Sequence, residues 1–568
     1  MPSAIAANTS PAVDDLLSNV IAASLLAWCL IVARILPNSS RAPLLRRKDY
    51  QRFSSYALHL HNKGLMVYVS TPTMADHRAE GAAVTRPEQE AGQRQAGERF
   101  AVGIDVGTSS VKVSVLTSHG RQAEFVSQPY STQSEHPGWA EQDPSQWWDA
   151  AGQALADALE AFPGIDARST RLGLTGQMHT SVLRDSTGTL IRPAILWSDT
   201  RATSLCAAIE ASSPLWESIA GQTPMPAFTS AHLAWLAENE PASLARAHTI
   251  AVPKDDLRLR LGAGWATEPS DASAMNLMNY RTDQWASDLI DHVGASHDQL
   301  PPILASTEVT GVITNPPPAR GRERQLLGIP VVAGAGDQAA QALALQVTDA
   351  GALGLGIGTS GVAFRAVAQP VRGAFRHALP ETWLALDSTH AAGLALAWWT
   401  DRTGIEYSLY DAEPDSRPES LPVFLPYLQG ARGGRAYPGT LTGLRATHTS
   451  KDLAAAVLEG VAIDLVRLAE GLPGSSGVDD VVRIGGRAGR IAALRQLLAD
   501  GLGRPVVFSP SGSASGAAIL AAHSDGWTPP ASDDFPPVLP TARGRTRFAH
   551  RLEQFEQTLH AMNQIDRS

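Results

Sequence analysis

Two segments far apart in the chain carry the same short motif between β-rich runs. In the first, Thr108 and Ser109 follow a glycine; in the second, Thr359 follows Gly358 and precedes a serine. Glycine permits the backbone angles of a tight hairpin tip. Backbone N–H groups and hydroxyls at such a tip can also bind a phosphate. Either motif alone is compatible with an ordinary hairpin turn, but the repetition favours two related domains that bind one nucleotide.

Two aspartates stand where carboxylates could act in phosphoryl transfer. Asp105 lies in an apolar run just before the first tip, and a carboxylate there needs a partner such as Mg²⁺. The alternative is an aspartate that hydrogen-bonds within the turn. Asp337 follows a strand-like run and a Gly-Ala-Gly stretch, and it precedes a helical pattern. It could accept a hydroxyl proton during phosphoryl transfer, or it could be a helix N-cap.

Two further motifs follow predicted strands. Gly485 and Gly486 could let an adenine or a ribose lie against the backbone, although a plain strand-to-helix turn is the alternative. Met178 and His179 combine an apolar side chain with a polar one, which suits a sugar. A single histidine in this setting could equally be structural.

The elements that must position these residues alternate between strand and helix patterns, which predicts an α/β fold. We expect a domain boundary near residue 348. Strands are expected at 171–174, 194–197, 331–333, 481–484 and 506–508, and helices at 144–159, 229–238, 339–347, 451–470, 515–522 and 548–563.

Residues 1–98 differ from the rest and are predicted to be an extension, largely disordered, with an apolar helix near 16–36. That run barely reaches the length of a membrane-spanning helix. Basic residues follow it, so a spanning helix would leave the main body in the cytoplasm. The alternative is translation from Met66 or Met74, which would remove the apolar run. Membrane contact is expected only if this segment is real and retained.

Composition limits the class of protein. The chain of 568 residues carries a formal net charge of −10, which disfavours nucleic acid as the main partner. Only two cysteines are present, which excludes a disulfide framework and fits a reducing, cytoplasmic location. The hydrophobic content of 44% is ordinary for a globular protein with full cores.

The chain resembles the FGGY carbohydrate kinase family, and within it most closely the xylulokinase branch. The stretch from Gly439 to Glu459 is similar to the family's C-terminal signature throughout. Further similar stretches are 136–143, 176–179, 253–255, 267–273, 300–302 and 424–427. The resemblance implies two actin-like, ribonuclease-H-like domains around a central cleft. It assigns 99–348 to the sugar site and catalytic base, 349–550 to ATP, and 551–568 to a terminal helix or tail.

The same resemblance implies roles for individual residues. Asp337 matches the catalytic base, and Asp105 matches the aspartate near phosphate and magnesium. Met178, His179 and Gln338 would contact the sugar. The remaining matches, to nucleotide-binding elements, are Thr108, Ser109, Gly358, Thr359, Gly485 and Gly486. ATP and Mg²⁺ are the implied cofactors, with a sugar as the second small-molecule partner and a homodimer as a possible assembly.

The reaction implied is transfer of the ATP γ-phosphoryl group to the C5 hydroxyl of D-xylulose. Another ketose or polyol (sedoheptulose, L-xylulose or D-arabitol) is the alternative substrate, and a catalytically weak sensor on the same fold is the alternative function. The sequence departs from the branch at Gln338, where asparagine is usual, and at Thr180, where glycine is usual. It also departs at Ala227 and His232 of the N-terminal signature and in the 430–435 loop. These departures bear on the exact sugar.

Overall fold

The computed structural model describes residues 97–212, 214–390, 392–428, 430, 438–474, 481–530 and 535–565. The chain divides into two units, 1–88 and 89–568, and all described residues belong to the second. The expected helix near 16–36 and most of the 430–435 loop therefore lie outside the described residues. Among the residues that are described, no helix has both the length and the apolar character needed to cross a membrane.

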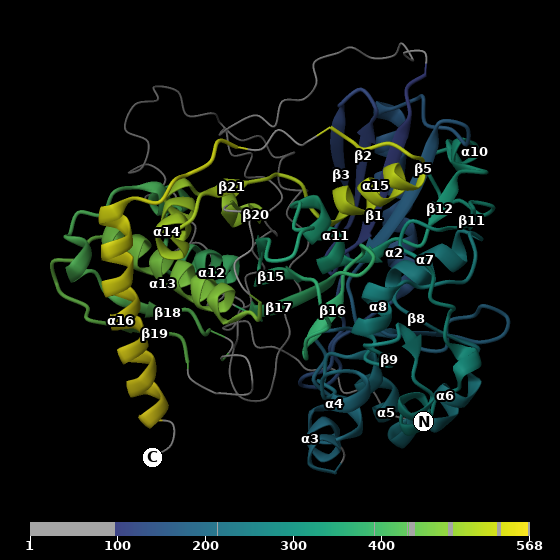
Figure 1. The fold of residues 1–568 in the computed structure, drawn as a ribbon, viewed down its shortest axis with the longest axis horizontal. Coiled ribbons are helices and arrows are strands. Elements are labelled where there is room, and N and C mark those ends of the chain that lie inside the picture. Colours follow the sequence, from purple (N-terminus) through teal and green to yellow (C-terminus); the bar gives the residue numbers. More distant parts are fainter. Residues whose placement is uncertain are drawn as a thin grey trace, which may run out of the picture. The chain divides into compact units, whose positions relative to one another are not determined.

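The first sheet is built around the predicted hairpin. Strands β1 and β2 pair antiparallel, and β5 pairs parallel with β1. The strand order along the sheet is β11-β12-β5-β1-β2-β3 (Figure 1). A short strand, β13, extends the pairing along β5. The bounds are β1 Phe100–Val106, β2 Val111–Thr117, β3 Gln122–Val126, β5 Thr170–Gly176, β11 Val309–Val312, β12 Pro330–Val332 and β13 Ala335–Gly336.

The second sheet repeats this arrangement. Its hairpin, β14 and β15, is antiparallel, and β20 pairs parallel with β14 as β5 does with β1. The order is β16-β17-β15-β14-β20-β21. The two Gly-Thr-Ser motifs therefore occupy equivalent hairpin tips, as predicted. The bounds are β14 Leu353–Ile357, β15 Gly361–Val367, β16 Ala374–Arg376, β17 Trp383–Thr389, β20 Val482–Gly485 and β21 Val506–Phe508.

Short strands form small ribbons outside the two sheets. They pair as β4 with β7, β6 with β8, β9 with β10, and β18 with β19. Their bounds are β4 Glu141–Gln142, β6 Val182–Arg184, β7 Ala194–Ile195, β8 Thr249–Ala251, β9 Met278–Asn279, β10 Gln284–Trp285, β18 Val423–Leu425 and β19 Thr440–Thr442.

The six predicted helices are present with shifted ends, and nine further helices lie among the described residues. The helix expected at 339–347 begins earlier, at Asp337, and ends at Ala344. The helix expected at 515–522 runs over Ser513–Ser524 as α15. Bounds are α2 Pro144–Ala161, α3 Thr203–Ser212, α4 Leu215–Ile219, α5 Thr229–Asn239, α6 Pro241–Arg246, α7 Pro253–Arg260, α8 Pro269–Ala274, α9 Ser287–His292, α10 Glu323–Leu326, α11 Asp337–Ala344, α12 Gly393–Thr403, α13 Ser450–Gly471, α14 Ala492–Leu502, α15 Ser513–Ser524 and α16 Ala542–Ile565.

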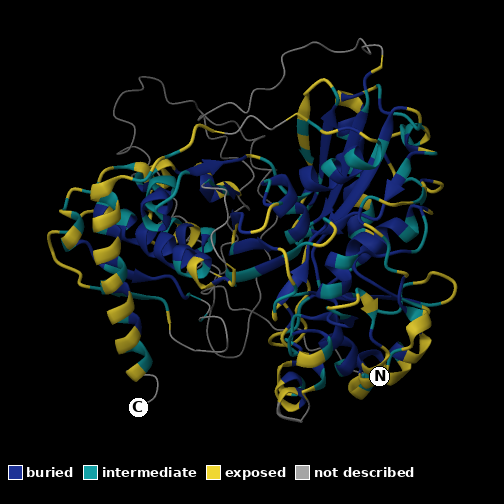
Figure 2. Cartoon of the chain, in the orientation of Figure 1, coloured by how far each residue is buried: buried dark blue, intermediate teal, exposed yellow. Residues whose placement is uncertain are grey.

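Helix α15 comes late in the chain but packs on the first sheet, over β1, β2 and β5 (Figure 1). Glycines on two of these strands make the approach possible. A Cβ at Gly103 would lie 1.9 Å from the Ala514 carbonyl oxygen, and one at Gly173 would lie 2.0 Å from that of Ala517. The helix therefore packs directly on the strand backbone. The residues on both sides of this contact are buried (Figure 2).

Candidate functional site

Asp105 is the penultimate residue of β1, and its side chain is buried, with 6% of the residue exposed. Ser513 Oγ donates a hydrogen bond of 2.6 Å to Asp105 Oδ2 from a position 408 residues later in the chain. Oδ1 has no hydrogen-bond partner among the described residues. Burial raises the pKa of Asp105, and the Ser513 bond and the charge of Lys112 oppose this. The partner lies on another element, so the alternative of a turn-capping aspartate is wrong.

Strand register brings Asp337 to the same edge of the sheet. Asp105 on β1 is level with Thr175 on β5, and Thr175 is level with Ala335 on β13. Two strand spacings separate the outer strands, or roughly 10 Å. Asp337 follows β13 directly as the first residue of α11. The N-cap of α11 is Gly336, so the alternative reading of Asp337 as that helix's N-cap is wrong.

The electrostatics of Asp337 suit a proton acceptor at neutral pH. Burial raises the pKa of this carboxyl to about 7, and the negative charge of Asp105 adds to the increase. Gln338 opposes it, because its side-chain amide donates to Asp337 Oδ1 at 3.3 Å. A carboxylate with a pKa near the working pH is the type of group that general-base catalysis requires.

Two of the predicted sugar-binding residues follow the strand that pairs with β13. Met178 and His179 follow β5, which ends level with β13. A Cβ on Gly336 would be 3.0 Å from Met178 Sδ, so Met178 lies directly against the residue before Asp337. His179 has a left-handed backbone, with φ of 69°. Its ring centroid lies 4.8 Å from that of Phe228, and its Nδ1 is 2.7 Å from the Ala274 carbonyl oxygen.

The first hairpin tip is held by side chains from three other segments of the chain. Trp197 Nε1 donates to Thr108 Oγ1 at 3.0 Å, and Thr108 Oγ1 donates to Gln177 Oε1 at 3.4 Å. Gln142 Nε2 donates to the Thr108 carbonyl at 2.7 Å. The hydroxyl of Thr108 is thus engaged within the protein, and the exposed residue of the tip is Ser109. Phosphate binding by either residue stays a prediction.

The second tip and the glycine pair lie on adjacent strands. Gly358 and Thr359 are exposed, and their carbonyls accept the Gly393 and Leu394 amides at the start of α12 at 3.0 and 2.9 Å. Gly486 has φ of 91°, and a Cβ there would be 2.4 Å from the Ile357 carbonyl oxygen. Only glycine fits that position.

Comparison with known proteins decides the family. The pattern described as the FGGY family of carbohydrate kinases, N-terminal domain, matches residues 100–344, and the corresponding C-terminal domain matches 355–524. The chain belongs to the FGGY family of carbohydrate kinases. It is 35% identical to the xylulose kinase of Escherichia coli K12 over 439 residues, covering 74% of this chain and 89% of the relative.

Solved structures agree with this FGGY assignment. The xylulose kinase of Rhodospirillum rubrum has 25% sequence identity and a TM-score of 0.71, with 83% of this chain and all of that chain covered. A gluconate kinase from Lactobacillus acidophilus has 21% identity and a TM-score of 0.70, with 82% and 98% covered. The second likeness shows the fold alone. This FGGY protein is a carbohydrate kinase, and members of the family use ATP as a substrate.

A buried ionic cluster of this FGGY kinase had no role assigned from sequence. Lys254 Nζ lies 2.8 Å from Asp255 Oδ1 and 3.1 Å from Asp271 Oδ2, with all three residues fully buried. Burial raises the pKa of Asp271 despite Lys254. Ser270 Oγ, held by Glu268 at 2.8 Å, accepts the Gly336 amide at 2.9 Å. The cluster therefore anchors the turn that presents Asp337. In the sequence, the signal that could have indicated this cluster was the presence of several charged residues within otherwise apolar segments.

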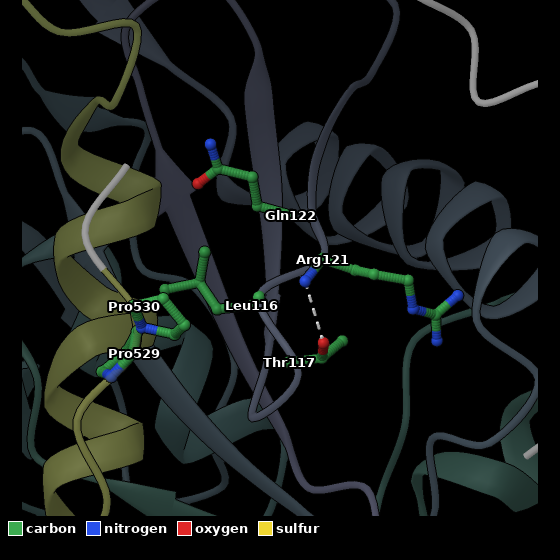
Figure 3. Close-up of a pocket in the computed structure, with 7 residues that line it drawn as sticks. Leu116, Thr117, Arg121, Gln122, Pro529 and Pro530 are labelled. Atoms are coloured by element: carbon green, nitrogen blue, oxygen red, sulfur yellow. Dashed lines mark hydrogen bonds between the residues drawn. The ribbon is translucent and has the colours of Figure 1, made fainter. Parts of the chain in front are cut away.

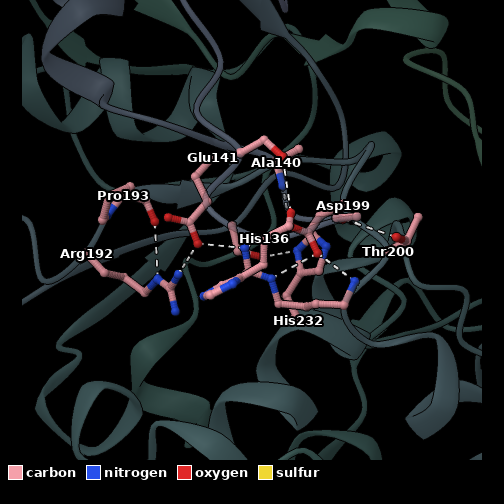
Figure 4. Close-up of polar contacts among 12 residues, drawn as sticks. His136, Ala140, Glu141, Arg192, Pro193, Asp199, Thr200 and His232 are labelled. Carbon is pink, nitrogen blue, oxygen red and sulfur yellow. Dashed lines mark hydrogen bonds and ion pairs between the residues drawn. The ribbon is translucent and has the colours of Figure 1, made fainter. Parts of the chain in front are cut away.

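A second polar cluster of the kinase includes Glu141, Asp199 and His232 (Figure 4). Asp199 accepts from the Ala140 amide at 2.6 Å and from Arg201 at 2.8 Å, and Arg201 also reaches Glu141 at 2.6 Å. His232 Nδ1 is 2.8 Å from Ser181 Oγ. Burial lowers the pKa of His232 to about 3. The histidine at this position, one of the departures noted in the sequence, is therefore neutral at ordinary pH.

The side chains of the described residues show whether this kinase could bind a magnesium ion. They contain no group of three or more His, Cys, Asp or Glu side chains able to hold a metal. Asp105 does offer a buried carboxylate oxygen without a hydrogen-bond partner there. Mg²⁺ at such sites is commonly bound by one or two carboxylates together with substrate phosphates. Asp105 fits an ion that arrives with the nucleotide.

The surface hollow shown in Figure 3 is unrelated to this chemistry. It lies at the turn between β2 and β3, and it is lined by Leu116, Thr117, Gly120, Arg121, Gln122, Pro529 and Pro530. None of the predicted site residues lines it.

Proposed function

We propose that this FGGY kinase transfers the γ-phosphoryl group of Mg-ATP to the C5 hydroxyl of D-xylulose, giving D-xylulose 5-phosphate and ADP. The observation that carries the proposal is the placement of Asp337. Its pKa is raised to about 7, and it starts a helix beside Met178 and at the strand ends that also carry Asp105. The xylulose kinases among its relatives support the choice of sugar.

Each residue has a defined task in the proposed reaction. Asp337 accepts the hydroxyl proton as the sugar oxygen bonds to phosphorus and the bond between that phosphorus and the ADP oxygen breaks. Asp105 would hold a magnesium ion, which neutralises charge on the phosphate oxygens. Met178 and His179 orient the sugar. Gly358, Thr359, Gly485 and Gly486 let the nucleotide approach the second sheet, and Ser109 adds a donor at the first tip.

A different ketose or polyol is the second candidate, and Gln338 is the observation that favours it. The buried Gln338 Oε1 has no hydrogen-bond partner in the described part of the chain. A buried acceptor without a partner costs free energy unless a ligand satisfies it. Gln338 is one methylene longer than the asparagine usual here, so its amide reaches a different point of the sugar. A weak sensor is disfavoured, since binding alone needs no carboxyl with a pKa near 7.

The test is a coupled ADP-release assay of the full chain with Mg-ATP and a panel of ketoses, aldoses and polyols. We expect D-xylulose to have the highest kcat/KM. Preference for another sugar would replace the substrate but keep the mechanism. Sugar-independent ADP release with every compound would contradict the kinase proposal.

A further inference from the structure

Among the described residues, Asp105 accepts one side-chain hydrogen bond, and its donor lies near the other end of the chain. The donor is Ser513, the first residue of α15, at 2.6 Å. The residue before it, Gly512, is the helix N-cap. The contact therefore joins the carboxylate at the first hairpin tip to the start of a helix that follows the second sheet.

The position of Ser513 is fixed by the close packing of α15. Gly103, two residues before Asp105 on the same face of β1, would clash with Ala514 if it carried a Cβ, at 1.9 Å. Gly173 on β5 makes the same approach to the helix, because a Cβ there would lie 2.0 Å from the Ala517 carbonyl oxygen. A helix seated on strand backbone has little freedom to slide. The hydroxyl of Ser513 is thus delivered to Asp105 by the packing.

Asp105 has a second potential partner, Lys112. Lys112 lies opposite Asp105 in the β1–β2 register, on the same face of the sheet. Opposite charges at such cross-strand positions attract, yet no ion pair joins these two in the described residues. Glu124 on β3, level with Ser114, is a second carboxylate that interacts with Lys112.

We propose that Ser513 is a positioning residue for Asp105. Its hydroxyl holds Oδ2, so that the carboxylate does not turn to Lys112 and Oδ1 remains available for the magnesium ion of the nucleotide. The inference rests on the proposed function, because it gives Oδ1 its ligand. It also means that the helix following the second sheet completes the site on the first.

The test compares three single variants of the full chain. Ser513→Ala removes the hydroxyl, and Ser513→Thr retains one. Ser515→Ala is the matched control, because it makes the same chemical change two residues along the same helix, at a serine bonded to Ser114 instead of Asp105. Binding of ADP is measured by calorimetry with Mg²⁺ and, separately, with EDTA, and kcat and sugar KM are measured alongside.

We expect Ser513→Ala to weaken MgADP binding about tenfold, the scale of losing a hydrogen bond to a charged group, with ADP binding in EDTA unchanged. The kcat should fall while the sugar KM stays unchanged. Ser513→Thr should restore both MgADP binding and kcat. Unchanged MgADP binding in Ser513→Ala overturns the proposal, as does an equal loss in Ser515→Ala. If the wild type phosphorylates no sugar but the MgADP difference persists, the proposed function fails and the role of Ser513 stands.

Discussion

Gly516 on α15 lies against the backbone of Ala340 on α11, so closely that a Cβ at Gly516 would be 1.8 Å from the Ala340 carbonyl oxygen. Each helix carries a site residue three positions before this crossing: Asp337 on α11 and Ser513 on α15. Asp105 bonds to Ser513 and raises the pKa of Asp337. The crossing thus brings the starts of two helices to the end of β1.

Gly516→Ala tests this crossing. The added methyl group cannot be accommodated without separating α11 from α15, so we expect a loss of about 1–3 kcal/mol in the free energy of unfolding. Gly471→Ala is the control, because an added Cβ at this exposed helical position meets nothing within 4 Å in the described residues. That change should be neutral or stabilising by up to about 1 kcal/mol. Urea unfolding measures both, and equal stabilities would show that the crossing is looser than described.

Asp337→Asn keeps the size of the side chain but removes the proton acceptor. We expect kcat to fall by about 10²–10⁴-fold, the usual contribution of a general base. Nucleotide binding should be nearly unchanged, because the predicted ATP residues lie mainly on the second sheet. Steady-state kinetics and calorimetry separate the two effects, with Asp288→Asn, an exposed aspartate on α9, as a control. Near-normal turnover would refute the assignment of the base.

The pH dependence follows from the raised pKa of Asp337, which is about 7 compared with 3.8 for an ordinary aspartate. Below pH 7 the carboxyl is protonated and cannot accept a proton, so kcat/KM should rise as the pH passes through about 7. Asp105→Asn removes a negative charge and should shift that midpoint downward. A midpoint unchanged by this variant would contradict the coupling between the two carboxyls.

The same shift affects stability with the opposite sign. Between pH 3.8 and about 7 the folded state retains a proton that the unfolded state has released. The contribution of Asp337 is therefore fully present below pH 3.8 and is lost as the pH rises through about 7. Asp337→Asn should flatten that part of the stability profile, which thermal unfolding across the range will measure.

His179 combines a predicted sugar contact with a left-handed backbone, φ 69°. His179→Ala should raise the sugar KM and also lower stability, because alanine keeps the unfavourable φ without the ring contacts. His179→Gly should lose sugar affinity to the same extent but be more stable than the alanine variant by about 1 kcal/mol. Sugar binding by calorimetry and thermal unfolding distinguish the two effects; unchanged sugar affinity in both variants would remove His179 from the pocket.

The sequence was sufficient for the main elements that carry the candidate site residues. Both Gly-Thr-Ser hairpins were predicted, because a tip of small residues between apolar β-rich runs is a local signal, and so was helix α13, whose apolar period is long. The candidate acceptor Asp337 was also recognised from its place between a strand and a helix. These features depend on residues close together in the chain.

Only the tertiary structure decided what surrounds those residues. The bond from Ser513 to Asp105, the backbone contact of Gly516 with Ala340, and the clustering of Lys254 with Asp271 join segments whose local patterns do not predict a meeting. The raised pKa of Asp337 likewise depends on burial and on a charge from another strand. Burial and long-range proximity are properties of the packed chain, so a local sequence pattern could place the carboxyl but not set its proton affinity.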